Sequence, residues 1–247
     1  MHRFLCPPDE IQKDLAVIRD KNEVHHLKTV LRLQTGEEVV VFDGKGREAA
    51  GKIASIDKSY FTVSLEKTHS DQIKTTRLCL ACAIPKKAKF ENIVEKTTEL
   101  NIDEIVPLQT QRTEILFNQD KALKKVFRYQ TIALNAAKQS QRKTIPVIHP
   151  VIKFSQFLKD KNPDDIWFIC ALGEKQNTLL QKLIETKKLP SKITFLIGPE
   201  GDFTPAEIEQ AIKAGCIPVS LGKTVLKVDT AAIVASALAN LIIGSHE

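Results

Sequence analysis

The stretch Phe195-Leu-Ile-Gly-Pro-Glu-Gly-Asp-Phe-Thr-Pro-Ala-Glu207 carries the strongest structural signal in the sequence. An apolar, strand-like run ends in a Gly-Pro-Glu-Gly turn at 198–201, and a helix start follows at once. Thr204, Pro205 and Glu207 supply an N-cap, a first-turn proline and the acid of a capping box. Ligands of open α/β sheets bind where loops leave the carboxyl ends of strands, and glycine lets backbone come close to a ligand. A ligand site is one interpretation, and an ordinary strand-to-helix turn is the other.

A second loop, Leu221-Gly-Lys-Thr-Val-Leu-Lys-Val-Asp-Thr-Ala231, repeats this design. It follows the apolar run Ile217–Leu221 and precedes an apolar segment at 230–243. Either loop alone is typical of a plain connection. Two such loops in tandem favour a shared ligand site.

The ligand predicted for these loops carries no phosphate. Gly222-Lys-Thr224 resembles the end of a P-loop, but Ile217 stands where that motif needs its first glycine. Gly44-Lys-Gly46 joins two predicted strands, whereas a dinucleotide fingerprint opens a helix. S-adenosylmethionine, with adenine, ribose and a sulfonium, fits glycine loops without a phosphate cradle. No zinc motif is present, so no metal is expected, and Cys79 and Cys82 are interpreted as buried core thiols.

From residue 77 onward, strand-like runs alternate with amphipathic segments. The predicted strands are 78–84, 104–108, 166–171, 193–197 and 217–221, and the predicted helices are 90–100, 121–141, 178–186, 205–214 and 230–243. This alternation predicts an α/β fold with a mostly parallel sheet and helices on both faces. The last helix is apolar nearly all round, which predicts burial within the subunit or in a subunit interface.

The first seventy residues have a different pattern. Runs at 37–43, 47–57 and 60–66 predict strands, with a hairpin turn at 43–46 and one short helix at 23–31. A small β-barrel of this kind is typical of an RNA-binding module. The polar stretch 67–76 is the predicted linker.

Charge points to a nucleic-acid partner. The 247 residues have a net charge of +6 and a pI near 9.0. Residues 121–143 contain seven lysines and arginines and no acid. Such a cluster favours binding to a phosphate backbone through the release of counterions. A solvated helix face is the alternative interpretation. No apolar run reaches membrane-spanning length and no signal peptide is evident. Five scattered cysteines favour thiols in the cytoplasm.

Several motifs resemble the bacterial small-subunit (16S) ribosomal RNA uridine-N3 methyltransferases. They are His25-His-Leu, Val30-Leu-Arg-Leu33, Phe42-Asp-Gly-Lys-Gly46, Lys96-Thr-Thr-Glu-Leu100, Ile105-Val-Pro-Leu108, Arg112, Ala136-Ala137, Gln139-Ser140, Arg142, Leu196-Ile-Gly-Pro-Glu-Gly201, Val219-Ser-Leu-Gly222 and Leu226-Lys-Val-Asp-Thr-Ala231. The resemblance covers essentially the whole chain in order and spacing.

This resemblance implies a PUA-like β-barrel over 1–70 and a SPOUT-type methyltransferase domain over 77–247. It further implies a trefoil knot near the C-terminus, a homodimer, S-adenosylmethionine as cofactor, and 16S ribosomal RNA or the small ribosomal subunit as partner. Threaded chains are very rare, so the knot rests on the resemblance alone.

Site residues are also implied by the resemblance. For cofactor binding we expect Leu172, Leu196, Gly198, Pro199, Glu200, Gly201, Leu221, Gly222, Val225, Leu226, Thr230 and Ala231. Asp229 is the candidate proton acceptor, with helix N-cap as its alternative role, and Arg112 the candidate for holding phosphate or uracil oxygens. RNA contacts are expected at Arg3, His25, His26, Lys28, Arg32, Arg128, Lys138 and Arg142, and a structural role near the domain junction is the alternative for the two histidines.

The chain departs from the family pattern at several positions. Asp202 replaces the second glycine of a Gly-Gly-Phe turn, Thr224 and Lys227 replace arginines, and Asp229 replaces a glutamate. Replacing Arg by Lys removes bidentate hydrogen bonding. Two alternatives therefore stay open: a ribose 2′-O-methyltransferase of the same superfamily, and an RNA-binding assembly factor without catalysis.

Overall fold

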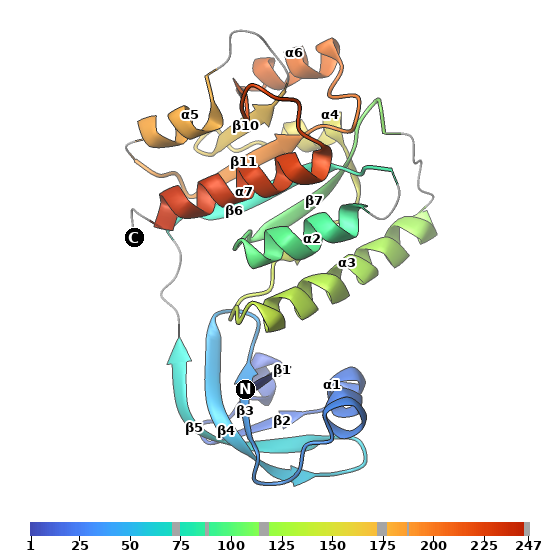
Figure 1. The fold of residues 1–247 in the computed structure, drawn as a ribbon, viewed down its shortest axis with the longest axis vertical. Helices are drawn as coiled ribbons and strands as arrows, with labels where there is room; N and C mark the ends of the chain where they lie inside the picture. Colours follow the sequence, from blue (N-terminus) through green and yellow to red (C-terminus); the bar gives the residue numbers. More distant parts are fainter. Residues whose placement is uncertain (71–74, 87–88, 114–118, 172–176, 187, 245–247) are drawn as a thin grey trace. The chain divides into compact units, whose positions relative to one another are not determined.

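The computed structural model describes residues 1–70, 75–86, 89–113, 119–171, 177–186 and 188–244. The chain divides into two compact units, one of residues 1–73 with 137–145 and the other of residues 74–136 with 146–247 (Figure 1). Segment 137–145 thus belongs with the N-terminal residues, whereas the sequence had placed it in the second domain. Among the described residues, no helix is both long and apolar enough to cross a membrane.

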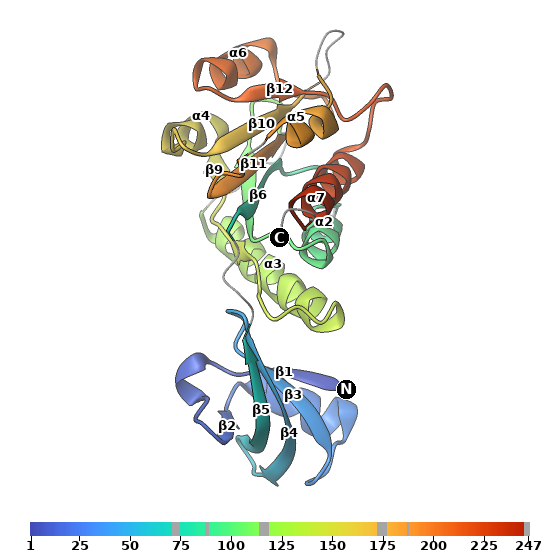
Figure 2. The same cartoon turned by 90° about the vertical axis from the view of Figure 1, so that its left-hand side faces the viewer.

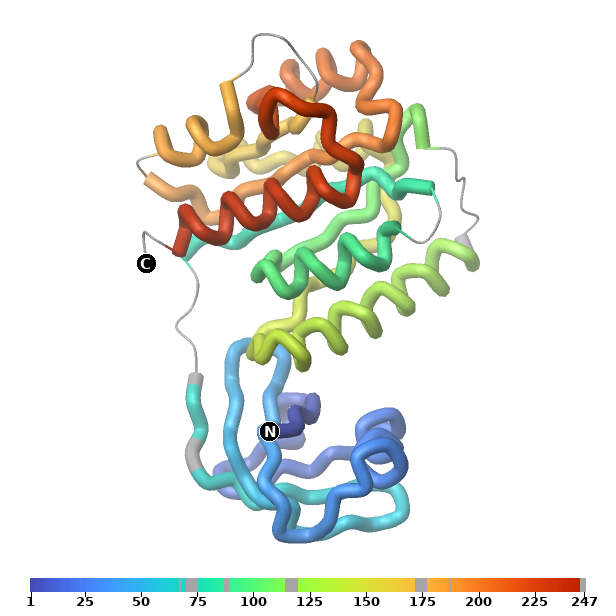
Figure 3. Tube along the Cα trace, viewed as in Figure 1, coloured from blue at the N-terminus to red at the C-terminus, as the bar shows by residue number. Residues whose placement is uncertain are grey.

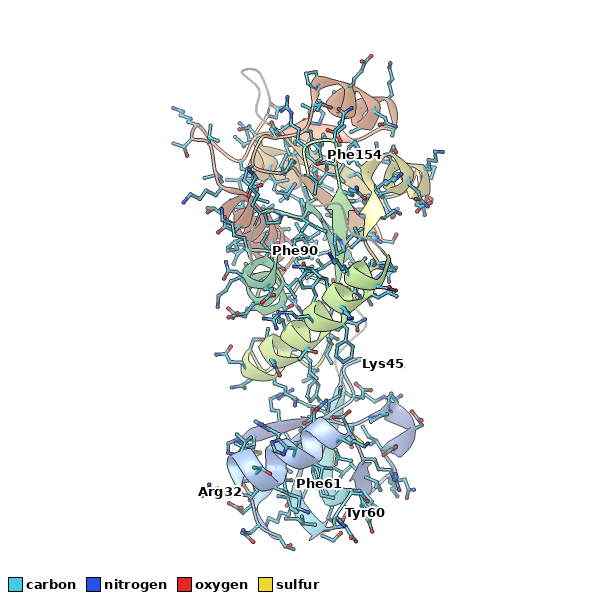
Figure 4. The ribbon with its side chains drawn as sticks, turned by 90° about the vertical axis from the view of Figure 1, so that its right-hand side faces the viewer. Arg32, Lys45, Tyr60, Phe61, Phe90 and Phe154 are labelled. Carbon is cyan, nitrogen blue, oxygen red and sulfur yellow. The ribbon has the colours of Figure 1, made fainter. Side chains whose placement is uncertain are left out.

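The first unit is a curled five-stranded sheet with the order β1-β3-β4-β5-β2. Its strands are β1 (His2–Leu5), β2 (Leu15–Ile18), β3 (Glu38–Phe42), β4 (Arg47–Ile56) and β5 (Phe61–Ser70). Alternate apolar side chains turn inward, and Phe4, Phe61 and Val39 are fully buried in the resulting core. Figure 4 labels Phe61 within this core.

The sequence predicted β3, β4 and β5 but missed β1 and β2. Both missed strands are only four residues long, so their alternation is too short to stand out. The predicted linker 67–76 was wrong in its first part, because β5 continues to Ser70. The predicted turn is confirmed: Asp43 N–H donates to the Arg47 carbonyl at 3.1 Å, and Gly44 and Gly46 both have positive φ.

The predicted helix at 23–31 is present as two joined pieces. They are α1 (Lys21–His25) and the π-helical η2 (His26–Leu31). The Asp20 carboxylate caps α1 by accepting hydrogen bonds from Asn22 N–H and Glu23 N–H. A short 3-10 turn, η1 (Pro8–Glu10), precedes β2.

The second unit contains a seven-stranded sheet in which every pairing is parallel. The order is β12-β10-β11-β6-β7-β8, with β9 also paired to β7. Its strands are β6 (Arg77–Ala83), β7 (Glu104–Gln109), β8 (Val147–Ile148), β9 (Ile152–Lys153), β10 (Ile166–Cys170), β11 (Lys192–Ile197) and β12 (Ile217–Val219). The parallel sheet is therefore confirmed, and only the two-residue strands β8 and β9 were missed.

Helices cover both faces of this sheet, as predicted (Figure 2). They are α2 (Lys89–Glu99), α3 (Gln119–Gln139), α4 (Phe154–Phe157), followed by the 3-10 turn η3 (Leu158–Asp160), α5 (Leu179–Glu185), α6 (Pro205–Lys213) and α7 (Val228–Gly244). Helices α4 and α6 lie on one face, and α2, α5 and α7 lie on the other. Phe90 of α2 and Phe154 of α4, labelled in Figure 4, mark these two layers.

The core on the α4 and α6 face is aromatic. The rings of Phe154 and Phe203 lie 5.0 Å apart, and those of Phe157 and Trp167 lie 4.7 Å apart. Such tilted pairs add stabilisation beyond the burial of their area. Because only Asp202 separates Phe203 from the Gly-Pro-Glu-Gly turn, this core anchors the turn to the sheet.

The chain after β12 returns across the sheet to α7. Strand β12 is an edge strand beside β10, yet α7 packs on α2, α5, β6 and β11. Figure 3 shows this return and the course of α7 beside α2. The trefoil knot that the resemblance implies for this region stays a prediction.

A buried carboxylate at the amino-terminal end of the parallel sheet holds three basic residues. Glu104 Oε2 lies 2.8 Å from Lys192 Nζ and 3.0 Å from His149 Nε2, and Glu104 Oε1 lies 3.5 Å from Arg77 Nη1. The hydrogen bond from His149, opposed by burial and reinforced by Lys192, lowers the pKa of Glu104 to about 2. The ion cluster therefore ties β6, β7 and β11 together.

We expect Glu104→Gln to lower the free energy of unfolding by roughly 2 kcal/mol at pH 7, after discounting for the partly exposed partners. A carboxylate whose pKa is lower in the folded than in the unfolded protein stabilises the fold at pH values above its unfolded pKa of 4.5. This contribution is lost as the pH falls towards the folded-state pKa of about 2. Urea unfolding between pH 7 and pH 3 measures this. The exposed Glu185→Gln is the control, and an identical acid dependence in wild type and Glu104→Gln would contradict the assignment.

Candidate active site

The register of the sheet brings the two signature loops together. Cys170 pairs with Ile197 of β11 on one side and with Val219 of β12 on the other. Since these strands are parallel and end at the same level, the loops after β10, β11 and β12 leave the same edge of the sheet. The predicted meeting of the two loops is therefore confirmed.

The Gly-Pro-Glu-Gly turn is tightly built. Asp202 N–H donates to the Pro199 carbonyl at 2.9 Å, and Asp202 has a φ of 60°. Asp is one of the few side chains that tolerate this left-handed conformation, which explains how it stands where the family has glycine. A Cβ on Gly198 would lie 3.0 Å from Phe203 N and 3.1 Å from Asp202 Oδ1. A side chain at 198 would thus crowd the turn, and its neighbours would have to move by a few tenths of an ångström.

The second loop is held at its start by Ser220. Its Oγ accepts a hydrogen bond from Gly222 N–H at 3.2 Å and donates one to the Gly222 carbonyl at 2.9 Å. Gly222 has a φ of 136°, a conformation that only glycine adopts without strain. The loop then enters α7, where Ala231 N–H donates to the Lys227 carbonyl.

Between the two loops lies a cavity of about 340 Å³. Its lining residues are Lys89, Cys170, Ala171, Ile197, Gly198, Pro199, Glu200, Asp202, Ser220, Leu221, Gly222, Thr224, Val225, Leu226, Lys227, Val228 and Ala231. The lining combines apolar side chains with two lysines and two carboxylates. Small-molecule sites are typically concave and mainly apolar, with a few placed polar groups.

Most residues expected in the cofactor site line this cavity. Of the twelve, eight do so: Gly198, Pro199, Glu200, Leu221, Gly222, Val225, Leu226 and Ala231. Leu196 is instead buried in the core, and Thr230 is exposed on α7. Leu172 lies outside the described residues. Lys89 was missed because it reaches the cavity from α2, more than a hundred residues before the loops, and no sequence motif indicates it.

Asp229 does not line the described part of the cavity. Helix α7 begins at Val228, so Asp229 lies inside the first turn and not at the N-cap. Its Oδ1 is buried and has no hydrogen-bond partner among the described residues. The acids that do line the cavity are Glu200 and Asp202.

A second cavity of about 480 Å³ adjoins the first. It is lined by Lys86, Gln111, Arg112, Thr113, Glu200 and Gly201. Arg112 Nη1 donates a hydrogen bond to the Gly201 carbonyl, and a Cβ on Gly201 would lie 3.3 Å from Arg112 Cδ. The structure therefore places Arg112 against the Gly-Pro-Glu-Gly turn, 89 positions away in sequence.

Comparison with known proteins decides the family. A profile described as "RNA methyltransferase domain" matches residues 72–240, and one described as "RNA methyltransferase PUA domain" matches residues 18–66. Ribosomal RNA small subunit methyltransferase E of Synechocystis is 34% identical over 99% of this chain and 78% of that protein. The chain belongs to the ribosomal RNA small subunit methyltransferase E family.

Solved structures agree with this membership. A methyltransferase from Legionella pneumophila, described as a complex with the bound cofactor SAM, has 27% identity and a TM-score of 0.86 and covers 98% of this chain and 97% of its own. The small subunit methyltransferase E of Neisseria gonorrhoeae, described as bound to S-adenosyl methionine, has 27% identity and a TM-score of 0.85, covering 96% and 95%. The methyltransferase E family fold thus extends over both units of the chain.

Three of the basic residues expected to contact RNA have partners within the first unit. Arg3 Nη1 lies 2.9 Å from Glu48 Oε2, and its side chain is only 8% exposed. Lys138 is ion-paired with buried Glu23, and the largely buried Arg142 donates to Thr144 Oγ1 at 3.0 Å. These ion pairs and hydrogen bonds do not support the RNA contacts predicted for the three residues. Sequence alone offers no sign that a lysine or arginine is paired in this way.

The other expected RNA contacts are more accessible. His25, Lys28, Arg32 and Arg128 are exposed; Arg32 is labelled in Figure 4. Arg128 Nη2 donates to Glu91 Oε2 at 2.7 Å, and Lys28 Nζ donates to the Asp57 carbonyl at 2.9 Å. His26 is half-buried, and burial followed by the charge of Lys138 lowers its pKa.

The cysteines are free thiols, as predicted. Cys79 and Cys82 are fully buried in β6. Burial raises the pKa of Cys79 to about 12 and raises the pKa of Cys82 further. A thiol with a raised pKa is a poor nucleophile and a poor metal ligand, so both residues serve the core of this methyltransferase.

Proposed function

We propose that the chain transfers the methyl group of S-adenosylmethionine to N3 of a uridine in 16S ribosomal RNA. The observation that carries this proposal is the cavity between the loops at 198–204 and 220–231, whose lining combines apolar side chains with two lysines and two carboxylates. Solved members of the same fold that are described with this cofactor support the assignment.

The cavity residues fit the cofactor by their chemistry. Ile197, Leu221, Leu226 and Val228 offer apolar surface to an adenine ring. Close backbone at Gly198 and Gly222 offers hydrogen bonds to its polar edge. The cofactor supplies a methyl group already activated by the positive sulfur.

For the RNA, the protein has to present an unpaired or flipped uridine, since N3 is occupied in a base pair. Arg112 would hold uracil oxygens or phosphate beside the turn, and His25, Lys28, Arg32 and Arg128 would contact the phosphate backbone. Holding N3 in line with the methyl group supplies much of the rate acceleration.

We further propose that the protein acts as a homodimer in the cytoplasm. The outer side of α7 is half-exposed and apolar, with Ile233, Val234, Leu238 and Ile242 partly accessible and Leu241 71% exposed. Accessible apolar side chains gathered on one helix favour contact with a second copy. The five free thiols favour a reducing compartment.

Methyl transfer from radiolabelled S-adenosylmethionine tests the proposal. Small ribosomal subunits and naked 16S ribosomal RNA, both lacking the modification, serve as parallel substrates. We expect incorporation that appears as 3-methyluridine in mass spectrometry of the nucleosides. Label on a ribose 2′-hydroxyl would favour the alternative transferase, and RNA binding without label would favour a non-catalytic assembly factor.

A further inference from the structure

Glu200 lies between two cavities of the second unit. Of the described residues, it alone lines both the cavity between the loops and the adjoining cavity beside Arg112. Glu200 is therefore the residue that the linings of the two cavities share. A group at this junction can touch ligands bound on either side.

The carboxylate of Glu200 is oriented by backbone. Lys86 N–H donates to Glu200 Oε1 at 3.0 Å, so the segment after β6 and the turn after β11 are linked through it. The buried position of Pro199 and the hydrogen bond from Asp202 N–H to its carbonyl limit the freedom of the turn. Glu200 itself is exposed, and this hydrogen bond engages only its Oε1, so Oε2 can accept a second hydrogen bond.

The second cavity complements the edge of a uracil. That edge presents a carbonyl oxygen, the N3–H donor and another carbonyl oxygen. Glu200 provides an acceptor, while Gln111 and Arg112 provide donors in the same cavity. A ribose hydroxyl would need no such arrangement of donors around an acceptor.

We propose that the second cavity binds the uracil base and that Glu200 is the catalytic base that accepts the N3 proton. This inference rests on the proposed function. The proton moves from N3 to the Glu200 carboxylate as the nitrogen electron pair forms the bond to the methyl carbon. The bond between that carbon and sulfur breaks, sulfur keeps its electron pair, and S-adenosylhomocysteine leaves. Arg112 stabilises the negative charge that develops on the uracil oxygens.

Three other nearby acids, Asp202, Glu207 and Asp229, line at most one of the two cavities in the described part of the chain. Glu207 is buried in the capping box of α6, and its Oε1 accepts from Gln111 N–H at 2.8 Å. Asp202 Oδ1 accepts from Phe203 N–H at 2.8 Å, and Asp229 lines neither cavity in the described part of the chain. Glu200 is consequently the acid that both ligands reach.

Glu200→Gln tests the proposal, because an amide oxygen can still accept from Lys86 N–H while the base is lost. We expect kcat at pH 7 to fall about 10²–10³-fold. The deficit should shrink as pH rises, since the uracil imide then ionises in solution. Affinity for S-adenosylmethionine, measured by calorimetry, should stay within about threefold of wild type. A purely structural role would instead weaken cofactor binding and leave no recovery at high pH.

The control is Glu209→Gln, an exposed carboxylate on α6 paired with Lys213. Its kcat should match wild type. A wild-type rate in Glu200→Gln, with 3-methyluridine still formed, would overturn the proposal. Loss of activity in Asp229→Asn together with a normal Glu200→Gln would assign the proton to Asp229. Absence of 3-methyluridine from the wild-type reaction would instead refute the proposed function itself.

Discussion

Gly198→Trp is expected to weaken binding of S-adenosylmethionine at least 100-fold, or by about 2.7 kcal/mol. Gly198 is buried and lines the cavity between the loops. Even a Cβ would crowd Phe203 N and Asp202 Oδ1, so an indole has to displace the turn or fill the cavity. Titration calorimetry with the cofactor measures the effect.

Two further variants distinguish a blocked cofactor site from a misfolded protein. Ile184→Trp adds the same ring to an exposed position on α5 and should bind the cofactor normally. Gly198→Ala should give an intermediate loss, since its single methyl contacts the turn at 3.0–3.1 Å. Thermal unfolding establishes that each variant is folded. Unchanged affinity in folded Gly198→Trp would refute the placement of the cofactor in this cavity.

The second large effect is expected for Lys138→Met, which should destabilise the first unit by roughly 3–5 kcal/mol. Lys138 pairs with Glu23, and their side chains are only 17% and 4% exposed. Burial, opposed by the charge of Lys138, already raises the pKa of Glu23. Without the lysine, a buried carboxylate has lost its counter-charge. Hydrogen exchange of residues 1–70 and urea unfolding measure the loss.

The pH dependence of Lys138→Met has a definite sign. A carboxylate with a raised folded-state pKa destabilises at neutral pH, and the penalty disappears as pH falls through that pKa towards 4.5. The variant should therefore recover part of its stability on acidification, and the double variant with Glu23→Gln should recover most of it at pH 7. Lys52→Met, which removes an exposed lysine 4.0 Å from two glutamates, should change stability by under about 1 kcal/mol. An equally small effect of Lys138→Met would show that the buried pair contributes little.

Local pattern was enough to predict most of the second unit. The capping box at Thr204 and Glu207 and the proline between them mark the start of α6, and the structure contains that helix from Pro205. A capping box involves only neighbouring residues, so it can be recognised without knowledge of the rest of the chain. The short strands β1, β2, β8 and β9 lack an equivalent signal and were missed.

Sequence pattern predicted the cavity residues that lie on the two glycine loops. Gly198, Glu200 and Gly222 line one cavity because β10, β11 and β12 end in register, which a βα pattern implies. Lys89 and Arg112 reach the same region from α2 and from the end of β7. Nothing in their local sequence says which loop they will meet, because that choice depends on strand order.

Local sequence pattern was enough to predict the alternation of strands and helices in the second unit and the two glycine loops. These properties follow from hydrophobic periodicity, backbone conformation and composition, which act locally along the chain. Contacts between distant segments decide which charges stay available. The side chains of Arg3 and Lys138 are only 8% and 17% exposed and are ion-paired, and Arg142 is buried. Asp229 lies outside the described cavity linings, whereas Glu200 lines both cavities. Burial and charge pairing depend on contacts between distant segments, and desolvation makes those contacts decide the role of each ionisable group.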